Sequence, residues 1–176
     1  MSSRPRLLPS LVTELFQAER SAYRHPIREA KRLGDVPPAI AMRAIAAHAN
    51  EVLDELPKLA RARNLEVAGA GTIVGEAFSD VRHFFVDRFL DMERSYRATL
   101  LGIRHGIDLV RVVRGAAADE ADTELVTFCD RWLAVRERLV VGVEKELDWF
   151  GRHQTFAARQ VALLPSFPAF LHPRTT

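Results

Sequence analysis

The stretch from residue 78 to residue 110 reads FSDVRHFFVDRFLDMERSYRATLLGIRHGIDLV, and it decides the fold class. Its large apolar residues recur at alternating steps of three and four positions. They are Phe78, Val81, Phe85, Phe89, Met92, Tyr96, Leu100, Ile103, Ile107 and Val110. This spacing is typical of an α-helix that buries one face along its whole length. The stretch therefore predicts an all-α fold built around one long helix.

The same spacing continues on both sides of this stretch. We expect four helices, which run from Pro9 to Leu33, from Pro38 to Arg63, from Ile73 to Arg114 and from Glu120 to His153. Pro26 and Pro57 fall inside the first two helices, where a proline removes a backbone hydrogen bond and favours a kink.

Short links between consecutive helices favour antiparallel neighbours. We therefore expect an up-down-up-down four-helix bundle with long third and fourth helices. Residues 155–176 contain several prolines among apolar residues, and we expect them to dock as an extended C-terminal tail. A chain of 176 residues can bury a core and fits one domain, so we assign residues 1–176 to a single helical-bundle domain.

The expected helix lengths differ between the two halves of the chain. At about 1.5 Å per residue, the third helix would span about 60 Å and the first two about 38 Å each. The hairpin of residues 98–140 would then extend beyond the first hairpin, and it is apolar on more than one side. Such a surface needs cover, so we predict a homodimer in which two copies of this hairpin pack about a two-fold axis. The alternative is that Gly102 breaks the third helix and its end folds back.

Composition restricts the functional classes. The formal net charge is only +2, and no Lys/Arg-rich run suggests an electrostatic surface for nucleic acid or membrane, so we expect neither as a partner. No apolar run reaches the roughly 20 residues that span a bilayer. Cys129 is the only cysteine, which excludes an intrachain disulfide and is compatible with a reducing compartment. We expect a cytoplasmic protein.

Several acids and histidines fall on or beside the apolar stripes. Six of them are expected at a similar height in the bundle, namely Glu19, His48, Glu51, His83, Asp87 and Glu146. Carboxylates and imidazoles that project inward at one level are how helical bundles hold metal centres. The sequence thus allows a carboxylate and histidine site for iron or manganese, as in a ferritin-like metal-binding protein or a metal-dependent oxidoreductase.

A competing interpretation needs no metal. Ferritin-like di-iron proteins carry Glu-x-x-His on two helices, and this chain contains no such motif, the nearest approach being Asp80-x-x-His83. Buried acids often pair with arginine. Suitable arginines are Arg82, Arg88, Arg94, Arg97 and Arg136. The six residues would then form a satisfied polar layer or lie on exposed helix flanks.

Other ligands remain open from the sequence. His48, His83 or His105 could ligate haem, and a cavity beside Trp132, Trp149 or Tyr96 could hold a small aromatic ligand. Cys129 lies on an apolar flank and is expected to be an inert core thiol. No complete catalytic, cofactor or nucleic-acid motif is present, so whether the protein is an enzyme stays undecided. The leading expectation is a non-catalytic, homodimeric binding protein without a cofactor.

Overall fold

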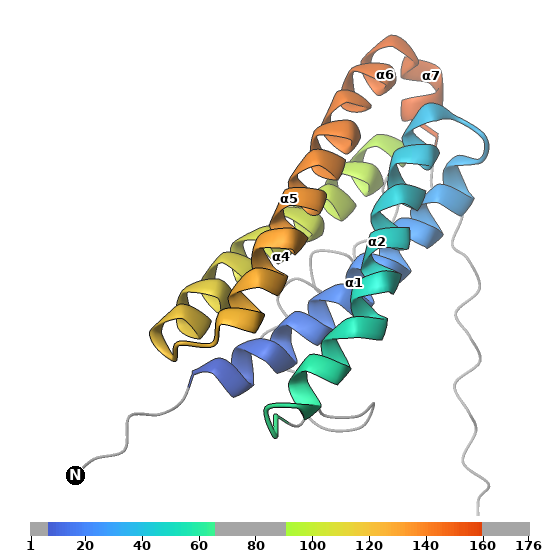
Figure 1. Cartoon of the computed structure of the whole chain (residues 1–176). Helices are drawn as coiled ribbons and strands as arrows, with labels where there is room; N and C mark the ends of the chain where they lie inside the picture. The colour runs from blue at the N-terminus through green and yellow to red at the C-terminus, as the bar shows by residue number, and fades with distance from the viewer. Residues whose placement is uncertain (1–6, 66–90, 160–176) are drawn as a thin grey trace, which may run out of the picture.

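The computed structural model describes residues 7–65 and 91–159, which form a bundle of α-helices (Figure 1). The helices are α1 (Leu8–Leu33), α2 (Pro37–Arg61), α4 (Met92–Asp119), α5 (Thr123–Lys145), α6 (Leu147–Arg152) and α7 (Gln154–Ala157). The predicted all-α four-helix bundle is confirmed by α1, α2, α4 and α5, which pack against one another.

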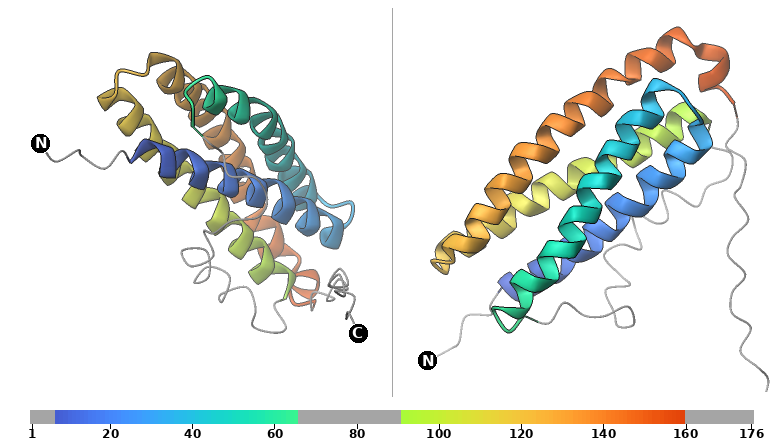
Figure 2. Two further views of the ribbon diagram at one scale, coloured as in Figure 1. Left: turned by 90° about the horizontal axis from the view of Figure 1, so that it is seen from below. Right: turned by 45° about the vertical axis from the view of Figure 1, so that its right-hand side comes forward.

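The four long helices form a closed ring in which each helix has two neighbours. α1 packs against α2 and α4, and α5 packs against the same two helices. Ser95 at the start of α4 meets Glu29 near the end of α1, so these two helices are antiparallel. The directions along the chain are therefore up, down, down and up (Figure 2). The predicted alternation of helix direction holds within the α1–α2 hairpin and within the α4–α5 hairpin. It does not hold between them, because α4 runs in the same direction as α2.

Several predicted helix boundaries can be compared with the structure. α4 is continuous through Gly102 and ends at Asp119, so the alternative in which Gly102 breaks the helix is wrong. α4 begins at Met92, and its N-cap Asp91 has an extended backbone, so the prediction of one continuous helix from Ile73 to Arg114 is wrong. Ile73 itself lies outside the described residues. The fourth predicted helix is interrupted at Glu146, where α5 gives way to α6. In the predicted tail, residues 155–157 belong to α7, and residues 160–176 lie outside the described ranges.

The expected overshoot of the second hairpin is not found in the described helices. α4 has 28 residues and α1 has 26, so the two helices have nearly equal lengths. α1 lies along α4, and most of the apolar residues of α4 are buried within the chain. Leu101 and Val112 are exceptions, with exposed fractions of 59% and 51%. The prediction failed because the estimated length of the third helix included residues before Asp91.

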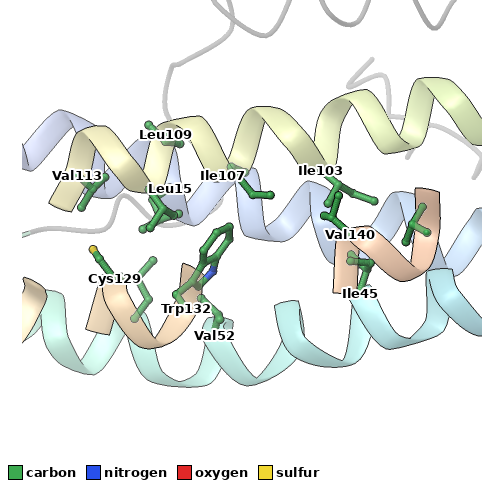
Figure 3. Packing of buried hydrophobic residues seen from close by; sticks show 14 of the residues in the cluster. Leu15, Ile45, Val52, Ile103, Ile107, Leu109, Val113, Cys129, Trp132 and Val140 are labelled. Atoms are coloured by element: carbon green, nitrogen blue, oxygen red, sulfur yellow. The ribbon is translucent and has the colours of Figure 1, made fainter. Parts of the chain in front are cut away.

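The apolar stripes of all four long helices meet in one core. Leu15, Val52, Ile107 and Trp132 project into it from α1, α2, α4 and α5 respectively (Figure 3). Gly106 lies beside the indole of Trp132, and a Cβ atom at position 106 would make an ordinary van der Waals contact with Cη2 of that ring at 3.9 Å. An indole, rather than the backbone of another helix, therefore packs beside this glycine.

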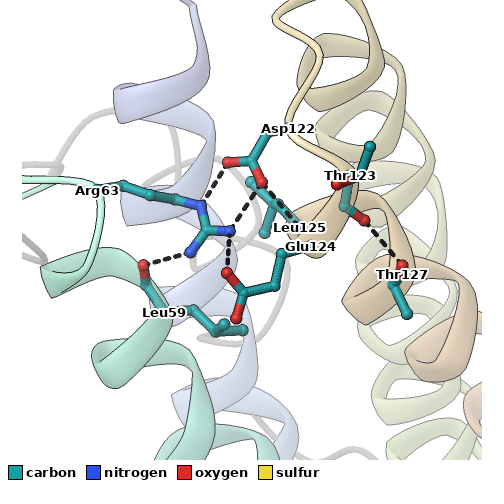
Figure 4. A network of polar contacts seen from close by, with 7 residues as sticks. All are labelled: Leu59, Arg63, Asp122, Thr123, Glu124, Leu125 and Thr127. Atoms are coloured by element: carbon teal, nitrogen blue, oxygen red, sulfur yellow. Dashed lines mark hydrogen bonds and ion pairs between the residues drawn. The ribbon is translucent and has the colours of Figure 1, made fainter.

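A polar network joins the end of α2 to the start of α5 (Figure 4). The Arg63 guanidinium donates hydrogen bonds to the Leu59 carbonyl at 2.8 Å, to Asp122 at 2.7 Å and to Glu124 at 2.9 Å. Asp122 also caps α5 by accepting a hydrogen bond from the Leu125 backbone N–H at 3.0 Å. The hydrogen bonds from Arg63 lower the pKa of Asp122. This network holds the two hairpins together at one end of the bundle.

The other end of the bundle is closed by α6 and α7. The Tyr96 hydroxyl on α4 donates a hydrogen bond to the Val143 carbonyl at 3.0 Å, and its ring packs on Phe150 with the ring centroids 5.0 Å apart. The backbone N–H of Met92 donates to the Arg159 carbonyl at 2.9 Å. The chain after α5 therefore folds back onto the start of α4.

Two glycines provide a stability test of this backbone. Gly102 lies in the interior of α4 with open space around a Cβ atom, so Gly102→Ala should raise the unfolding free energy by about 1 kcal/mol through helix propensity. Gly34 ends α1 with a φ of +77°, where an L side chain is strained, so Gly34→Ala should lower it by about 1 kcal/mol or more. Urea unfolding measures both changes. Destabilisation by Gly102→Ala would contradict a continuous α4.

Candidate functional site

The interior of the bundle contains a buried guanidinium, which belongs to Arg136 on α5 and is 1% exposed. Its Nη2 donates a hydrogen bond to Oε2 of Glu19 on α1 at 2.7 Å. Its Nε donates to Nδ1 of His48 on α2 at 3.0 Å. The guanidinium carbon also lies 4.7 Å from the ring centroid of Trp132. We call Glu19, His48, Trp132 and Arg136 the core polar cluster.

Helical spacing brings these four side chains together. Trp132 and Arg136 are four residues apart on α5, so the guanidinium can stack on the face of the indole. Glu19 is four residues after the buried Leu15, and His48 is three residues after the buried Ile45. Each polar side chain therefore occupies a position in the buried stripe of its helix, and α1, α2 and α5 meet at Arg136.

The hydrogen bonds determine the protonation of His48. Arginine can only donate, so Nδ1 of His48 must be the unprotonated acceptor, and the neutral ring carries its proton on Nε2. Burial, and secondly the charge of Arg136, lower the pKa of His48 to about 4. Burial raises the pKa of Glu19, and the adjacent guanidinium opposes that increase. The cluster therefore contains a neutral imidazole beside a paired carboxylate.

The cluster is not fully satisfied by the protein alone. Oε1 of Glu19 and the indole N–H of Trp132 have no hydrogen-bond partner in the described structure. An unpaired buried polar atom typically costs about 1–3 kcal/mol. Two further buried atoms without a partner among the described residues, Oε1 of Glu29 and Nε of Arg32, lie near the end of α1.

The structure brings together two of the six residues predicted as metal ligands. Glu19 and His48 meet at Arg136, whose guanidinium binds both of them. Glu51 is exposed on α2, and Glu146 is partly buried at the junction of α5 and α6. His83 and Asp87 lie outside the described residues, so the complete set stays a prediction. Within residues 7–65 and 91–159, no group of three or more His, Cys, Asp or Glu residues could hold a metal ion.

The competing interpretation, in which buried acids pair with arginine, describes Glu19 correctly. Arg136 was one of the five arginines that the sequence offered to a buried acid, and it pairs with Glu19. Arg97 instead pairs with Glu93 on the surface of α4. A cationic guanidinium between Glu19 and His48 disfavours a metal ion there, because two positive charges would share one buried site.

A second buried carboxylate was not predicted from the sequence. Glu29 on α1 is 1% exposed and accepts a hydrogen bond from Oγ of Ser95 on α4 at 2.6 Å. The Arg32 guanidinium lies 3.5 Å from the same carboxylate. Burial raises the pKa of Glu29, and Ser95 and Arg32 oppose that increase. Its spacing of three from Pro26 and four from Leu33 is the signal that places it in the buried stripe.

Three further candidates from the sequence lie within the described residues, whereas His83 lies outside them. Cys129 is a buried thiol whose pKa is raised to about 12 by burial, as the prediction of an inert core thiol requires. His105, a haem candidate, lies on the surface of α4 with its side chain 52% exposed. Trp149 stacks on His153 with ring centroids 4.1 Å apart.

The outward surface of α4 and α5 is built from ion pairs and apolar side chains. Arg104 pairs with Glu144 at 2.8 Å, Arg111 with Glu137 at 3.0 Å, and Arg114 with Asp130. The exposed apolar residues of this surface are Leu101, Val112 and Val141. We call these nine residues the α4–α5 outer face.

Comparisons with protein-family models, curated proteins and solved structures found no match to this chain. Among the described helices, none is both long and apolar enough to cross a membrane.

The buried ion pair gives a prediction about stability. Arg136→Met should lower the unfolding free energy by about 3–5 kcal/mol, because the carboxylate of Glu19 loses its partner in the core. The double variant Glu19→Leu/Arg136→Met should recover most of this loss, since no charge then remains buried. Urea unfolding of both single variants and the double variant measures the coupling. Additive losses would show that the two side chains do not interact.

His48 gives a prediction about pH dependence. The unfolded chain protonates this imidazole near pH 6.5, but the folded protein does so only near pH 4. Stability should therefore fall as the pH decreases through this window, by up to roughly 3 kcal/mol from this one group. His48→Asn retains an acceptor for Nε of Arg136 but cannot titrate. In this variant, the part of the decrease in unfolding free energy at low pH that comes from His48 should disappear. Urea unfolding across the pH range tests it, and identical pH profiles for the two proteins would refute it.

Proposed function

We propose that this protein is a non-catalytic binding protein that self-associates as a homodimer through the hairpin of residues 98–140, with Val141 at its edge. The observation that carries the proposal is the α4–α5 outer face. Leu101, Val112 and Val141 expose 59%, 51% and 49% of their surface there. Scattered exposed apolar residues are ordinary, but these three lie on one hairpin among charges that are already paired.

The charges of this face support self-association. Each of the three arginines forms an ion pair with an acid on the neighbouring helix, so the face offers a partner little uncompensated charge. A two-fold interface places identical surfaces against each other, which would be unfavourable for a face with strong charge of one sign. Two such hairpins could pack as an intermolecular four-helix layer, and a stable dimer typically buries about 800 Å² per subunit.

The core supports a binding role rather than a catalytic one. The carboxylate of Glu19 and the imidazole of His48 both bind the guanidinium of Arg136, and the Tyr96 hydroxyl donates to a backbone carbonyl. These groups stabilise the arrangement of the helices and are buried away from any external substrate. Surfaces are therefore the best-supported functional elements of the described chain.

Sedimentation equilibrium provides the test of the proposed dimer. The wild-type protein should sediment as a dimer, and Leu101→Glu/Val112→Glu should shift it to a monomer because charges would be buried at the interface. Ile40→Glu is the matched control, since Ile40 is 65% exposed on α2, outside the α4–α5 outer face. A monomeric wild-type protein, or equal dissociation by the control, would contradict the proposal.

A further inference from the structure

The second half of α1 carries an uneven distribution of charge. Residues 20–32 contain five arginines or lysines and a single acid, Glu29, whereas the whole chain has a net charge of only +2. Glu29 is buried against Ser95 and does not contribute a carboxylate to the surface. The outward side of this half of α1 is therefore cationic.

Four of these cations form a line along the helix. Arg20, Arg24, Arg28 and Lys31 follow one another at steps of four, four and three, so they share one side of α1. We call these four residues the basic stripe. Arg24, Arg28 and Lys31 are exposed and Arg20 is partly buried. The stripe spans about 16 Å along the helix axis.

The cations of the stripe have no acidic partner in the described structure. No ion pair or hydrogen bond joins any of the four side chains to a described residue. Nearby cations on other helices are instead paired, Arg43 with Asp35 and Arg97 with Glu93. The four cations of the stripe thus form a line of uncompensated positive charge along one side of α1.

Two further observations describe the environment of the stripe. Tyr23 and Ile27 lie beside the cations on α1 and are 38% and 41% exposed. The pKa of His25 is lowered, first by burial and then by the positive charges of Arg28, Arg32 and Arg24. The stripe is therefore a region of positive potential with apolar side chains at its edge.

We propose that the basic stripe of α1 binds an acidic, amphipathic helix of a partner protein. Carboxylates spaced by one helical turn match guanidinium groups at the same spacing, and Arg presents a planar fork that suits a carboxylate. The apolar side of such a helix contacts Tyr23 and Ile27. This inference deepens the proposed binding function by assigning a class of partner, and it uses a different face from the proposed dimer.

Two other anionic partners fit the stripe less well. A duplex nucleic acid presents phosphates along its backbone but no apolar surface there for Ile27 and Tyr23. An anionic bilayer is flat and would contact neighbouring helices as well, where the nearby charges are already paired. A line of charge with apolar neighbours favours a partner that is itself one helix wide.

Fluorescence anisotropy with a designed peptide tests the inference on the full chain. The probe is a helical peptide of about 15 residues with Glu at every fourth position and Leu beside it, compared with the same peptide carrying Gln instead of Glu. The Glu peptide should bind and should weaken with added salt, whereas the Gln peptide should bind at least about tenfold more weakly. Equal binding of the two peptides would overturn the proposal, as would no binding of the Glu peptide at low salt.

Matched charge reversals locate the binding. Arg24→Glu/Arg28→Glu should weaken binding of the Glu peptide by about tenfold or more. Lys58→Glu/Arg61→Glu changes the net charge equally on exposed positions of α2 and should leave affinity within about twofold. Equal losses would indicate a general charge effect and overturn the assignment. The pKa of His25, measured by NMR, should rise in the α1 variant because two nearby positive charges are replaced by negative ones. An unchanged circular dichroism spectrum shows that the variant is folded.

Two additional probes test the class of partner. A DNA duplex and phosphatidylserine vesicles should each bind more weakly than the Glu peptide at the same salt concentration. If the stripe bound either of them more tightly, the proposal of an acidic helix as the partner would be overturned. Sedimentation equilibrium of Arg24→Glu/Arg28→Glu should match that of the wild-type protein. If the protein is a dimer that does not bind the Glu peptide, only this inference fails. If it binds the peptide but is a monomer, only the proposed dimer fails.

Discussion

The arrangement of the helices depends on one buried guanidinium. Removing an arginine from water is costly unless its charge is paired and its N–H groups are bonded. Arg136 meets that requirement only where α1 supplies Glu19 and α2 supplies His48. The three helices must therefore keep one relative register, because a slip of one turn would leave the guanidinium and Glu19 buried without each other. α4 contributes to the site indirectly, because its Gly106 lies beside the indole of Trp132.

Polar contacts at both ends of the bundle support the same register. Arg63 connects the end of α2 to the cap of α5, and Glu29 connects the end of α1 to Ser95 at the start of α4. Apolar packing stabilises the bundle but is compatible with several helix positions, whereas these directional hydrogen bonds are not. The buried polar groups mostly engage one another, whereas the outward surfaces of α1 and of the α4–α5 hairpin are exposed to partners.

The sequence predicted the fold class and parts of the core for identifiable reasons. The spacing of apolar residues identified α1 and α2 to within about two residues at each end, and both helices continue through Pro26 and Pro57. Glu19 and His48 fell on apolar stripes, and both are buried. The same spacing carries no information about direction, so the parallel course of α2 and α4 could not be derived. It also could not select Arg136 among five arginines, because that choice depends on which helices are neighbours.

The basic stripe was missed for a different reason. A search for Lys/Arg-rich runs detects adjacent cations, but the cations of α1 are separated by one helical turn and become neighbours only in the helix. Similarly, Glu29 lies next to cations in the sequence and resembles a surface residue, although its helical position faces α4. In both cases the sequence gives the type of residue but not the side of the folded helix on which its side chain lies.

The central claim is that Arg136 donates a hydrogen bond to a neutral His48 in the core. The most direct measurement is the ¹⁵N–¹⁵N scalar coupling across that bond, recorded by NMR between Nε of Arg136 and Nδ1 of His48, which lie 3.0 Å apart. The account predicts a resolved coupling and an Arg136 Nε–H that exchanges slowly with water. An Nε–H that exchanges rapidly and shows no coupling would contradict it, because the guanidinium would then be solvated rather than bound between the helices.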